Sequence, residues 1–311
     1  MPVTPRLFCF GFGYSARALA DRLRPRGWRI AGTTRDPGKQ AALERLGVES
    51  VPFAGEGPLE SAGTALAGTT HLLLSAPPSE DGDPVLRHHA EDLVALPGLR
   101  WVGYLSTTGV YGDSAGGWVD EEAPVAPSGP RGRRRAEAEA GWLALWRRHG
   151  LPVHLFRLAG IYGPGRNQLE ALRAGTAKRI VKPGQVFSRI HVEDIAAVLE
   201  ASIDRPDPGR AYNVCDDLPD DPCRVVEEAA RLLGVAPPPL TPFEAADLSP
   251  MARSFYADSR RVSNRRIREE LGVALRYPTY REGLRALLQT LSPQTPPPQT
   301  PPPQTLPDAK S

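Results

Sequence analysis

Short apolar runs alternate with helical patterns along the first two-thirds of the chain. The apolar runs predict buried strands, at 6–13, 28–35, 48–55, 71–78, 99–112 and 151–165. Apolar positions at helical spacing predict helices between them, at 15–27, 36–47, 84–96 and 136–150. Because the strand runs lack a clean polar alternation and helices separate them, they indicate a parallel sheet covered on both faces. We therefore expect an α/β fold with a Rossmann-like, doubly wound parallel sheet.

The pattern loosens after residue 165 and predicts a second, mostly helical part of the chain. A further strand is predicted at 211–217, so we expect the sheet domain to comprise 1–165 and 188–217. A smaller substrate lobe is expected to comprise 166–187 and 218–291.

The last twenty residues contain a repeated PPPQT unit. Proline removes backbone donors, and few apolar residues are present to anchor the segment, so 292–311 predict a solvated, disordered tail. A ligand for a proline-binding domain is the alternative interpretation.

The charge balance limits the partners that the chain is expected to bind. Its 311 residues include 38 Lys and Arg against 36 Asp and Glu, a formal charge of +2. We therefore expect neither nucleic acid nor a membrane as a partner. Cys9, Cys215 and Cys223 are too scattered for a zinc site or a disulfide framework, which indicates the reducing cytoplasm.

A G-x-G-x-x-A pattern follows the first predicted strand and opens the first predicted helix. Gly11 permits a tight turn, Gly13 lets the backbone approach a pyrophosphate, and the small Ala16 lets the helix pack near the strand. With Tyr14 and Ser15 between them, these residues predict a dinucleotide phosphate loop at a helix N-terminus. A strand–helix turn that binds nothing is the alternative.

The residues after the second predicted strand bear on the choice of cofactor. Arg35 can donate two hydrogen bonds to a 2′-phosphate, and Thr33 and Thr34 add hydroxyl donors. Asp36 is the competing ligand for an NAD ribose, but it precedes Pro37 and is better placed to cap the next helix. The sequence therefore favours NADP over NAD.

Several stretches, in order, resemble the extended short-chain dehydrogenase/reductase superfamily, in its NAD-dependent epimerase/dehydratase family. They are LSTTGVYGD (105–113), RLAGIYGPGRN (157–167), SRIHVEDIAAVLEA (188–201) and AYNVCDD (211–217). The resemblance covers roughly residues 5–290 in total. It implies a nicotinamide cofactor at the carboxyl edge of the sheet and hydride transfer, often on sugar nucleotides.

The resemblance also implies positions for site residues. Thr107 matches the family's active-site hydroxyl, and we expect Ser75 and Ala76 to lie beneath the nicotinamide half of the cofactor. From its position at a strand end, Thr107 can hydrogen-bond a substrate oxygen as charge develops. A threonine that caps the following loop is the alternative.

The chain departs from the family at its Tyr-x-x-x-Lys pair, in the stretch GPRGRRRAEAEAGW (129–142). Arg131 falls on the tyrosine and Arg135 on the lysine. Arginine stays protonated, so it cannot serve as a general base, although Arg135 can contact ribose or stabilise an anion. The chain thus resembles the atypical branch of the superfamily.

Other side chains are candidates for the missing proton donor. Tyr111 and Tyr162 follow strand ends, and His191 lies in the HVED motif. Asp194 of the same motif is expected to cap the helix that follows it.

These residues favour an NAD(P)-dependent oxidoreductase or epimerase-like protein that transfers hydride to or from a small carbonyl or sugar-nucleotide substrate. The alternative is a catalytically silent NADP-binding redox sensor, which the loss of the Tyr–Lys pair supports. Helices 84–96 and 136–148 are expected on one face of the sheet. In the resembling family such helices pair two subunits, so the resemblance predicts a homodimer.

Overall fold

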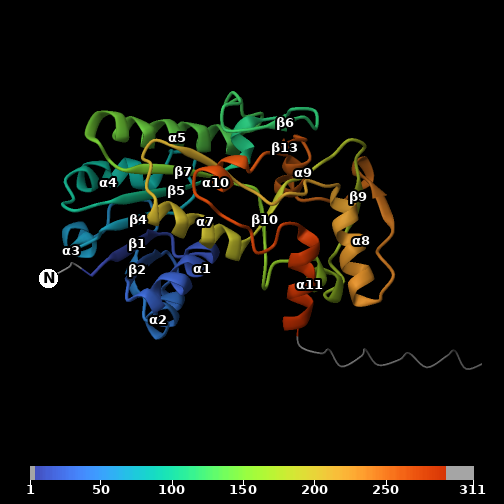
Figure 1. The fold of residues 1–311 in the computed structure, drawn as a ribbon, viewed down its shortest axis with the longest axis horizontal. Coiled ribbons are helices and arrows are strands. Elements are labelled where there is room, and N and C mark those ends of the chain that lie inside the picture. The colour runs from blue at the N-terminus through green and yellow to red at the C-terminus, as the bar shows by residue number, and fades with distance from the viewer. Residues whose placement is uncertain (1–3, 292–311) are drawn as a thin grey trace, which may run out of the picture.

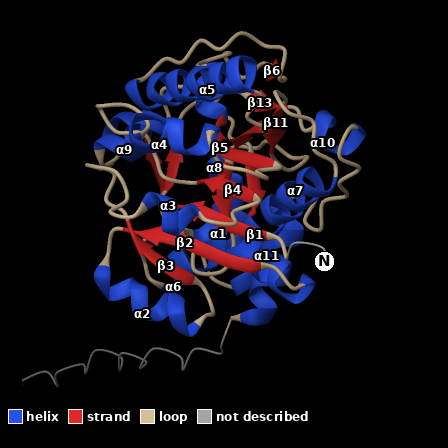
Figure 2. Cartoon of the chain, turned by 90° about the vertical axis from the view of Figure 1, so that its left-hand side faces the viewer, coloured by secondary structure: helices blue, strands red, loops and turns tan. Residues whose placement is uncertain are grey.

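The computed structural model describes residues 4–291, and the predicted tail lies outside these described residues. A seven-stranded sheet forms its centre, with all of its strand pairs parallel (Figure 2). The strands, in spatial order, are β11 (Ala211–Val214), β7 (Val153–Leu158), β5 (Trp101–Thr107), β4 (His71–Leu74), β1 (Arg6–Phe10), β2 (Arg29–Thr34) and β3 (Glu49–Pro52). This order confirms the Rossmann-like, doubly wound prediction.

Two apolar clusters cover the two faces of the sheet, as near-continuous apolar strands require. On one face α1 (Tyr14–Leu23), α2 (Pro37–Arg45) and α7 (Val192–Asp204) contribute buried side chains. On the other, α3 (Ala62–Leu66), α4 (Pro84–Val94) and α5 (Pro130–His149) do so. Helices α4 and α5 therefore share a face, as predicted; their pairing of two copies stays a prediction.

A smaller group of elements lies beside the carboxyl edge of the sheet (Figure 1). Its helices α6 (Gln168–Arg173), α8 (Pro222–Leu233) and α11 (Tyr280–Thr290) share an apolar cluster. Helix α9 (Pro250–Phe255) is short, whereas the short helix α10 (Arg265–Glu269) packs against the sheet strand β11 instead. Three parallel pairs of short strands complete it: β8 (Gly160–Tyr162) with β10 (Arg189–His191), β9 (Arg179–Val181) with β12 (Leu240–Pro242), and β6 (Trp118–Val119) with β13 (Arg261–Val262).

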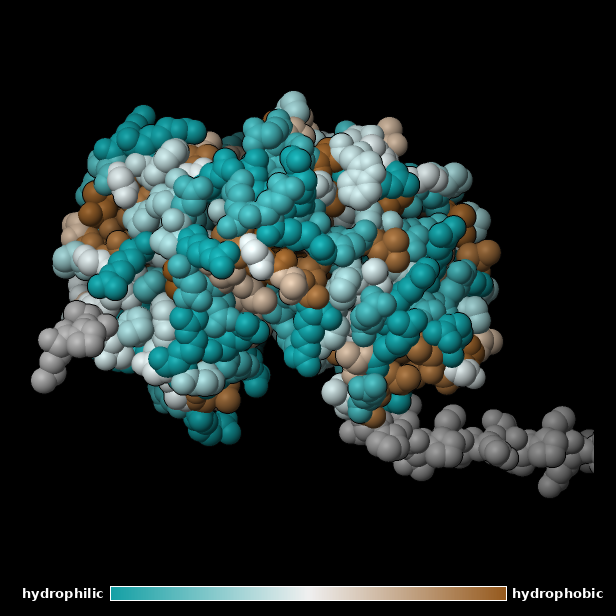
Figure 3. All heavy atoms as spheres, viewed as in Figure 1, coloured by the Kyte–Doolittle hydropathy of each residue, from teal (hydrophilic) through white to brown (hydrophobic). Residues whose placement is uncertain are grey.

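The division into a sheet domain and a substrate lobe stays a prediction. Ile267 and Leu271, from the later part of the chain, pack in the apolar cluster of the sheet. The surface is hollowed between the part that carries α2 and the part that carries α11, and hydrophilic residues cover most of this face (Figure 3).

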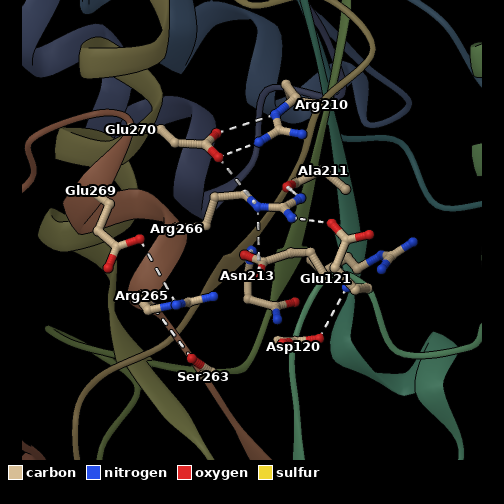
Figure 4. Close-up of polar contacts among 12 residues, drawn as sticks. Asp120, Glu121, Arg210, Ala211, Asn213, Ser263, Arg265, Arg266, Glu269 and Glu270 are labelled. Carbon is tan, nitrogen blue, oxygen red and sulfur yellow. Dashed lines mark hydrogen bonds and ion pairs between the residues drawn. The ribbon is translucent and has the colours of Figure 1, made fainter.

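Side chains protect the edge strand β11. The Asn213 N–H donates to Glu121 Oε1 over 2.8 Å, and Arg266 Nη1 donates to the Ala211 carbonyl over 3.1 Å (Figure 4). Arg266 is in turn paired with Glu270 at 3.6 Å. Because these groups occupy backbone positions that a further strand would pair with, they block edge-to-edge association at β11.

Within residues 4–291 the three cysteines are buried and free. No helix in this range is long and apolar enough to cross a membrane.

Candidate cofactor and substrate site

The predicted phosphate loop lies between β1 and α1 and is tied to both neighbouring strands. Gly11 has φ +86°, and a Cβ there would lie 2.9 Å from the Ala76 nitrogen. Its N–H donates to Thr33 Oγ1 over 2.7 Å. The Ser75 and Ala76 N–H groups both donate to the Phe10 carbonyl, over 2.8 and 2.9 Å. Ser75 and Ala76 thus pack directly against Gly11. Only glycine can occupy this position without strain.

Gly13 has a different environment. It is the N-cap of α1 with φ −101°, and a Cβ there would meet no atom within 4 Å. The first turn of α1 contains no acidic residue and no side-chain cap, while Ser15 and Ala16 are buried. The helix N-terminus therefore keeps unsatisfied N–H groups beside open space, an arrangement suited to an anion.

Tyr14 links the phosphate loop to the loop that follows β8. Its hydroxyl donates to the Pro164 carbonyl over 2.8 Å, and a Cβ on Gly163 would lie 2.5 Å from this hydroxyl. Burial raises the pKa of Tyr14 to about 12. The hydroxyl therefore stays protonated and can keep this bond near neutral pH.

Arg35 lines a hollow of about 270 Å³ at the ends of β2 and β3, together with Thr34, Gln40 and Glu60. Among the described residues Arg35 has no hydrogen bond or ion pair. Asp36 caps α2, with its Oδ1 accepting from the Gly38 N–H over 2.9 Å, which confirms the predicted role of Asp36.

Thr107 ends β5 at the carboxyl edge of the sheet. Its Oγ1 accepts from the Gly109 N–H over 3.1 Å and caps the short helix η2 (Thr108–Tyr111). The capping interaction considered as the alternative is therefore present, and it leaves the hydroxyl hydrogen free to donate. The role of Thr107 toward a substrate stays a prediction.

Tyr111 lies in a buried polar network. Its hydroxyl donates to Asn213 Oδ1 over 2.7 Å and accepts from Arg157 Nη1 over 2.9 Å. Arg157 pairs with Glu139 at 2.8 Å, and Glu139 accepts from Ser106 Oγ over 2.5 Å. Burial raises the pKa of Tyr111 to about 12. The network anchors η2, while a catalytic role for Tyr111 stays a prediction.

The other two candidate proton donors, Tyr162 and His191, contact each other. Tyr162 contacts the ring of His191 edge-on, with centroids 5.1 Å apart, and its hydroxyl faces the Thr279 carbonyl at 3.5 Å. His191 Nδ1 accepts from the Glu193 N–H over 3.2 Å. Burial lowers the pKa of His191 to about 4, so its ring is neutral at pH 7.

The prediction that Asp194 caps α7 was wrong. His191 is the N-cap of α7, and Asp194 instead accepts the N–H groups of Arg276 and Tyr277 over 2.7 and 3.1 Å. The carboxylate therefore holds a segment more than eighty residues away in sequence.

The predicted arginine cluster forms the first turns of α5. Arg135 donates to the Leu105 carbonyl and lies 5.7 Å from the centre of the Tyr104 ring, and its contact with a ribose stays a prediction. Arg131 lies over the Phe255 ring at 5.2 Å. A role for Arg135 in catalysis stays a prediction.

Sequence reasoning missed the partners that complete these contacts. The sequence could have indicated the pair of Glu139 and Arg157, because charged residues in a buried helix and strand are rarely unpaired. Nothing in the local sequence points to Asn213 or Phe255, because their partners are distant in the chain.

Comparison with known proteins gives matches over most of the chain. A model of the "NAD dependent epimerase/dehydratase family" matches residues 86–215. Protein YeeZ of Escherichia coli K12 is 31% identical over 281 residues, covering 86% of this chain and 94% of YeeZ. A conserved protein of unknown function from Silicibacter pomeroyi DSS is 53% identical, with a TM-score of 0.86 over 92% of this chain and 99% of that one.

Two more distant structures share the fold. The dTDP-glucose 4,6-dehydratase of Bacillus anthracis str. Ames, in complex with NAD, is 18% identical, with a TM-score of 0.74 over 92% of this chain and 96% of that one. The human epimerase family protein SDR39U1, with NADPH, is 18% identical, with a TM-score of 0.71 over 92% of this chain and 100% of that one.

Proposed function

The chain belongs to the NAD-dependent epimerase/dehydratase family of the extended short-chain dehydrogenase/reductases, and on that premise we propose that it is an oxidoreductase or epimerase-like enzyme. It binds a nicotinamide dinucleotide at the carboxyl edge of the sheet. When bound, the nicotinamide ring supplies or accepts a hydride, and the substrate is a small carbonyl compound or a sugar nucleotide. The dTDP-glucose dehydratase among the structural neighbours supports the latter class.

The observation that carries this proposal is the contrast between the two loop glycines. Contact with Ala76 and a positive φ explain Gly11, but within residues 4–291 no atom would contact a Cβ on Gly13. A glycine beside open space at an uncapped helix N-terminus fits the close approach of a pyrophosphate.

Thr107 is proposed to bind the substrate. Its oxygen already accepts from the Gly109 N–H, so the hydroxyl hydrogen remains for a substrate oxygen. Such a bond strengthens as negative charge develops on that oxygen during hydride transfer to a carbonyl.

The cofactor is proposed to be NADP, because Arg35 lines a hollow beside β2 and has no protein acceptor among the described residues. Replacing Arg35 by Gln should raise the Kd for NADPH by about tenfold or more and leave that for NADH within about twofold, since only NADPH carries the 2′-phosphate. Fluorescence titration of both coenzymes measures this.

Arg45→Gln is the matched control, because Arg45 is an exposed arginine of the neighbouring helix α2 that donates to the Ala41 carbonyl. It should change neither affinity. Equal affinity of the wild-type protein for both coenzymes would contradict the selection of NADP by Arg35, and tighter binding of NADH would favour NAD.

A second candidate function rests on the arginines at the Tyr–Lys positions. Arg135 is committed to the Leu105 carbonyl, and neither arginine can exchange a proton. Such a chain fits a redox sensor that binds NADP without turnover. Oxidation of NADPH in the presence of aldehydes, ketones and sugar nucleotides distinguishes the two: sustained turnover supports the enzyme, and tight binding without turnover supports the sensor.

A further inference from the structure

One arginine at the start of α5 differs from its neighbours in its bonding. Three of the four have protein acceptors: Arg133 donates to the Ser128 carbonyl at 3.2 Å, Arg134 to Glu80 at 2.7 Å and Arg135 to the Leu105 carbonyl. In the described part of the chain, Arg131 has neither a hydrogen bond nor an ion pair, and its only recorded partner is the Phe255 ring. Its N–H donors are therefore available to a ligand.

The backbone places Arg131 at the proposed reaction site. A Cβ on Gly132 would lie 2.7 Å from the Gly109 carbonyl oxygen, so the first turn of α5 packs directly on η2. Thr107 caps the same short helix. Arg131 thus borders the carboxyl end of β5, the edge where doubly wound sheets bind their ligands.

The contact with Phe255 orients the guanidinium without using its donors. Phe255 belongs to α9, which has no buried residue, and 54% of Phe255 remains exposed. A cation–π contact does not use the N–H groups of the guanidinium, which lie in its plane and can make two parallel bonds. The two coplanar oxygens of a carboxylate fit that arrangement.

We propose that Arg131 is a specificity-determining residue that binds a carboxylate of the substrate, with Phe255 holding its guanidinium in place. The substrate of the enzyme is then an organic acid and not its neutral counterpart. This inference rests on the proposed function, because it places the substrate beside Thr107 and the cofactor.

The test uses the full-length protein saturated with NADPH. It is titrated with a panel of carboxylates. Each is paired with the compound in which a neutral amide or alcohol replaces that carboxylate, as UDP-glucose does for UDP-glucuronic acid. At least one acid should bind tenfold or more tightly than its neutral partner. Arg131→Gln should abolish that difference, whereas Arg133→Gln, in the same turn of α5, should keep it.

Phe255→Leu should weaken acid binding severalfold, because it removes the aromatic ring beside the Arg131 guanidinium and leaves the charge of Arg131 unchanged. The inference is overturned if no acid in the panel binds better than its neutral partner, or if Arg131→Gln keeps the difference. It is also overturned if Arg131→Gln weakens UDP-glucose and UDP-glucuronic acid equally, which would assign Arg131 to the diphosphate. Titration of NADPH into cofactor-free samples of the same proteins keeps these outcomes separate from a failure to bind cofactor.

Discussion

At the scale of single residues, similar side chains perform different tasks. Gly11 is required by the backbone, with a positive φ and no room for a Cβ, while no contact in the described part of the chain requires a glycine at residue 13. Arg134 and Arg131 lie one turn apart in one helix, yet Arg134 is paired with Glu80, while among residues 4–291 Arg131 contacts only the Phe255 ring. Function is therefore best sought at residues that the fold leaves unused.

Tyr111 allows a test of anchoring against catalysis. Tyr111→Phe removes the bonds to Asn213 and Arg157 and leaves their polar groups buried. The free energy of unfolding should fall by about 1–3 kcal/mol, the usual cost of such unsatisfied groups, while NADPH affinity stays unchanged. Urea denaturation and coenzyme titration measure the two quantities.

Tyr212→Phe is the control, because Tyr212 adjoins Asn213 and its hydroxyl has no hydrogen bond among the described residues. Its free energy of unfolding should change little. Equal stability of the two variants would contradict the anchoring role. A stable Tyr111→Phe protein without turnover would instead identify Tyr111 as the proton donor.

Residue-level prediction from sequence succeeded where the interaction is local. The capping role of Asp36 follows from its position before Pro37, and its partner is two residues away. Asp194 was mispredicted because its partners, the Arg276 and Tyr277 N–H groups, come from a distant segment. The residues 131–135 contain no signal that tells which of their four arginines lacks a hydrogen-bond acceptor among the described residues.

At the scale of elements, most strands of the central sheet were predictable because they lie in short, mostly apolar runs between turn signals. The short strands outside the central sheet were not predictable in this way. For example, Arg179–Val181 pairs with Leu240–Pro242, and Trp118–Val119 pairs with Arg261–Val262. Strands of two or three residues carry no periodicity, and their partners lie too far along the chain to be inferred.

Strand β7 carries a buried histidine whose protonation opposes folding. His154 Nε2 accepts from the Asp207 N–H over 3.0 Å, and burial lowers the pKa of His154 to about 4. Below the unfolded pKa of about 6.5, the unfolded chain binds a proton that the folded protein excludes until the pH nears 4. Stability from this group is therefore present at pH 7 and decreases as the pH falls.

His154→Gln removes this titration. The unfolding free energy of the wild-type protein minus that of the variant should fall by about 2 kcal/mol between pH 7 and pH 5. The slope is about 1.4 kcal/mol per pH unit below the unfolded pKa. Urea denaturation at each pH measures it. His149→Gln, at the exposed end of α5, is the surface control for the substitution itself. A difference that does not vary with pH would contradict the burial argument for His154.

At the scale of the whole molecule, the doubly wound sheet brings separate loops to one edge. The phosphate loop follows β1, Arg35 follows β2, Ser75 follows β4 and Thr107 ends β5. Tyr14 connects this edge to the loop after β8 through the Pro164 carbonyl. A ligand bound along the edge would therefore contact both the sheet and the smaller group of helices beside it.

The most direct test of the central claim is titration of NADPH and NADH into the wild-type protein and Gly13→Val. A Cβ at residue 13 would meet no atom of the described residues within 4 Å, and a φ of −101° suits valine. The variant should therefore keep the wild-type Tm while its side chain occupies the space proposed for the pyrophosphate. We predict saturable binding of NADPH to the wild-type protein and none to the variant. Absence of binding of either coenzyme to the wild-type protein at millimolar concentrations, or unchanged binding to a folded Gly13→Val protein, would contradict it.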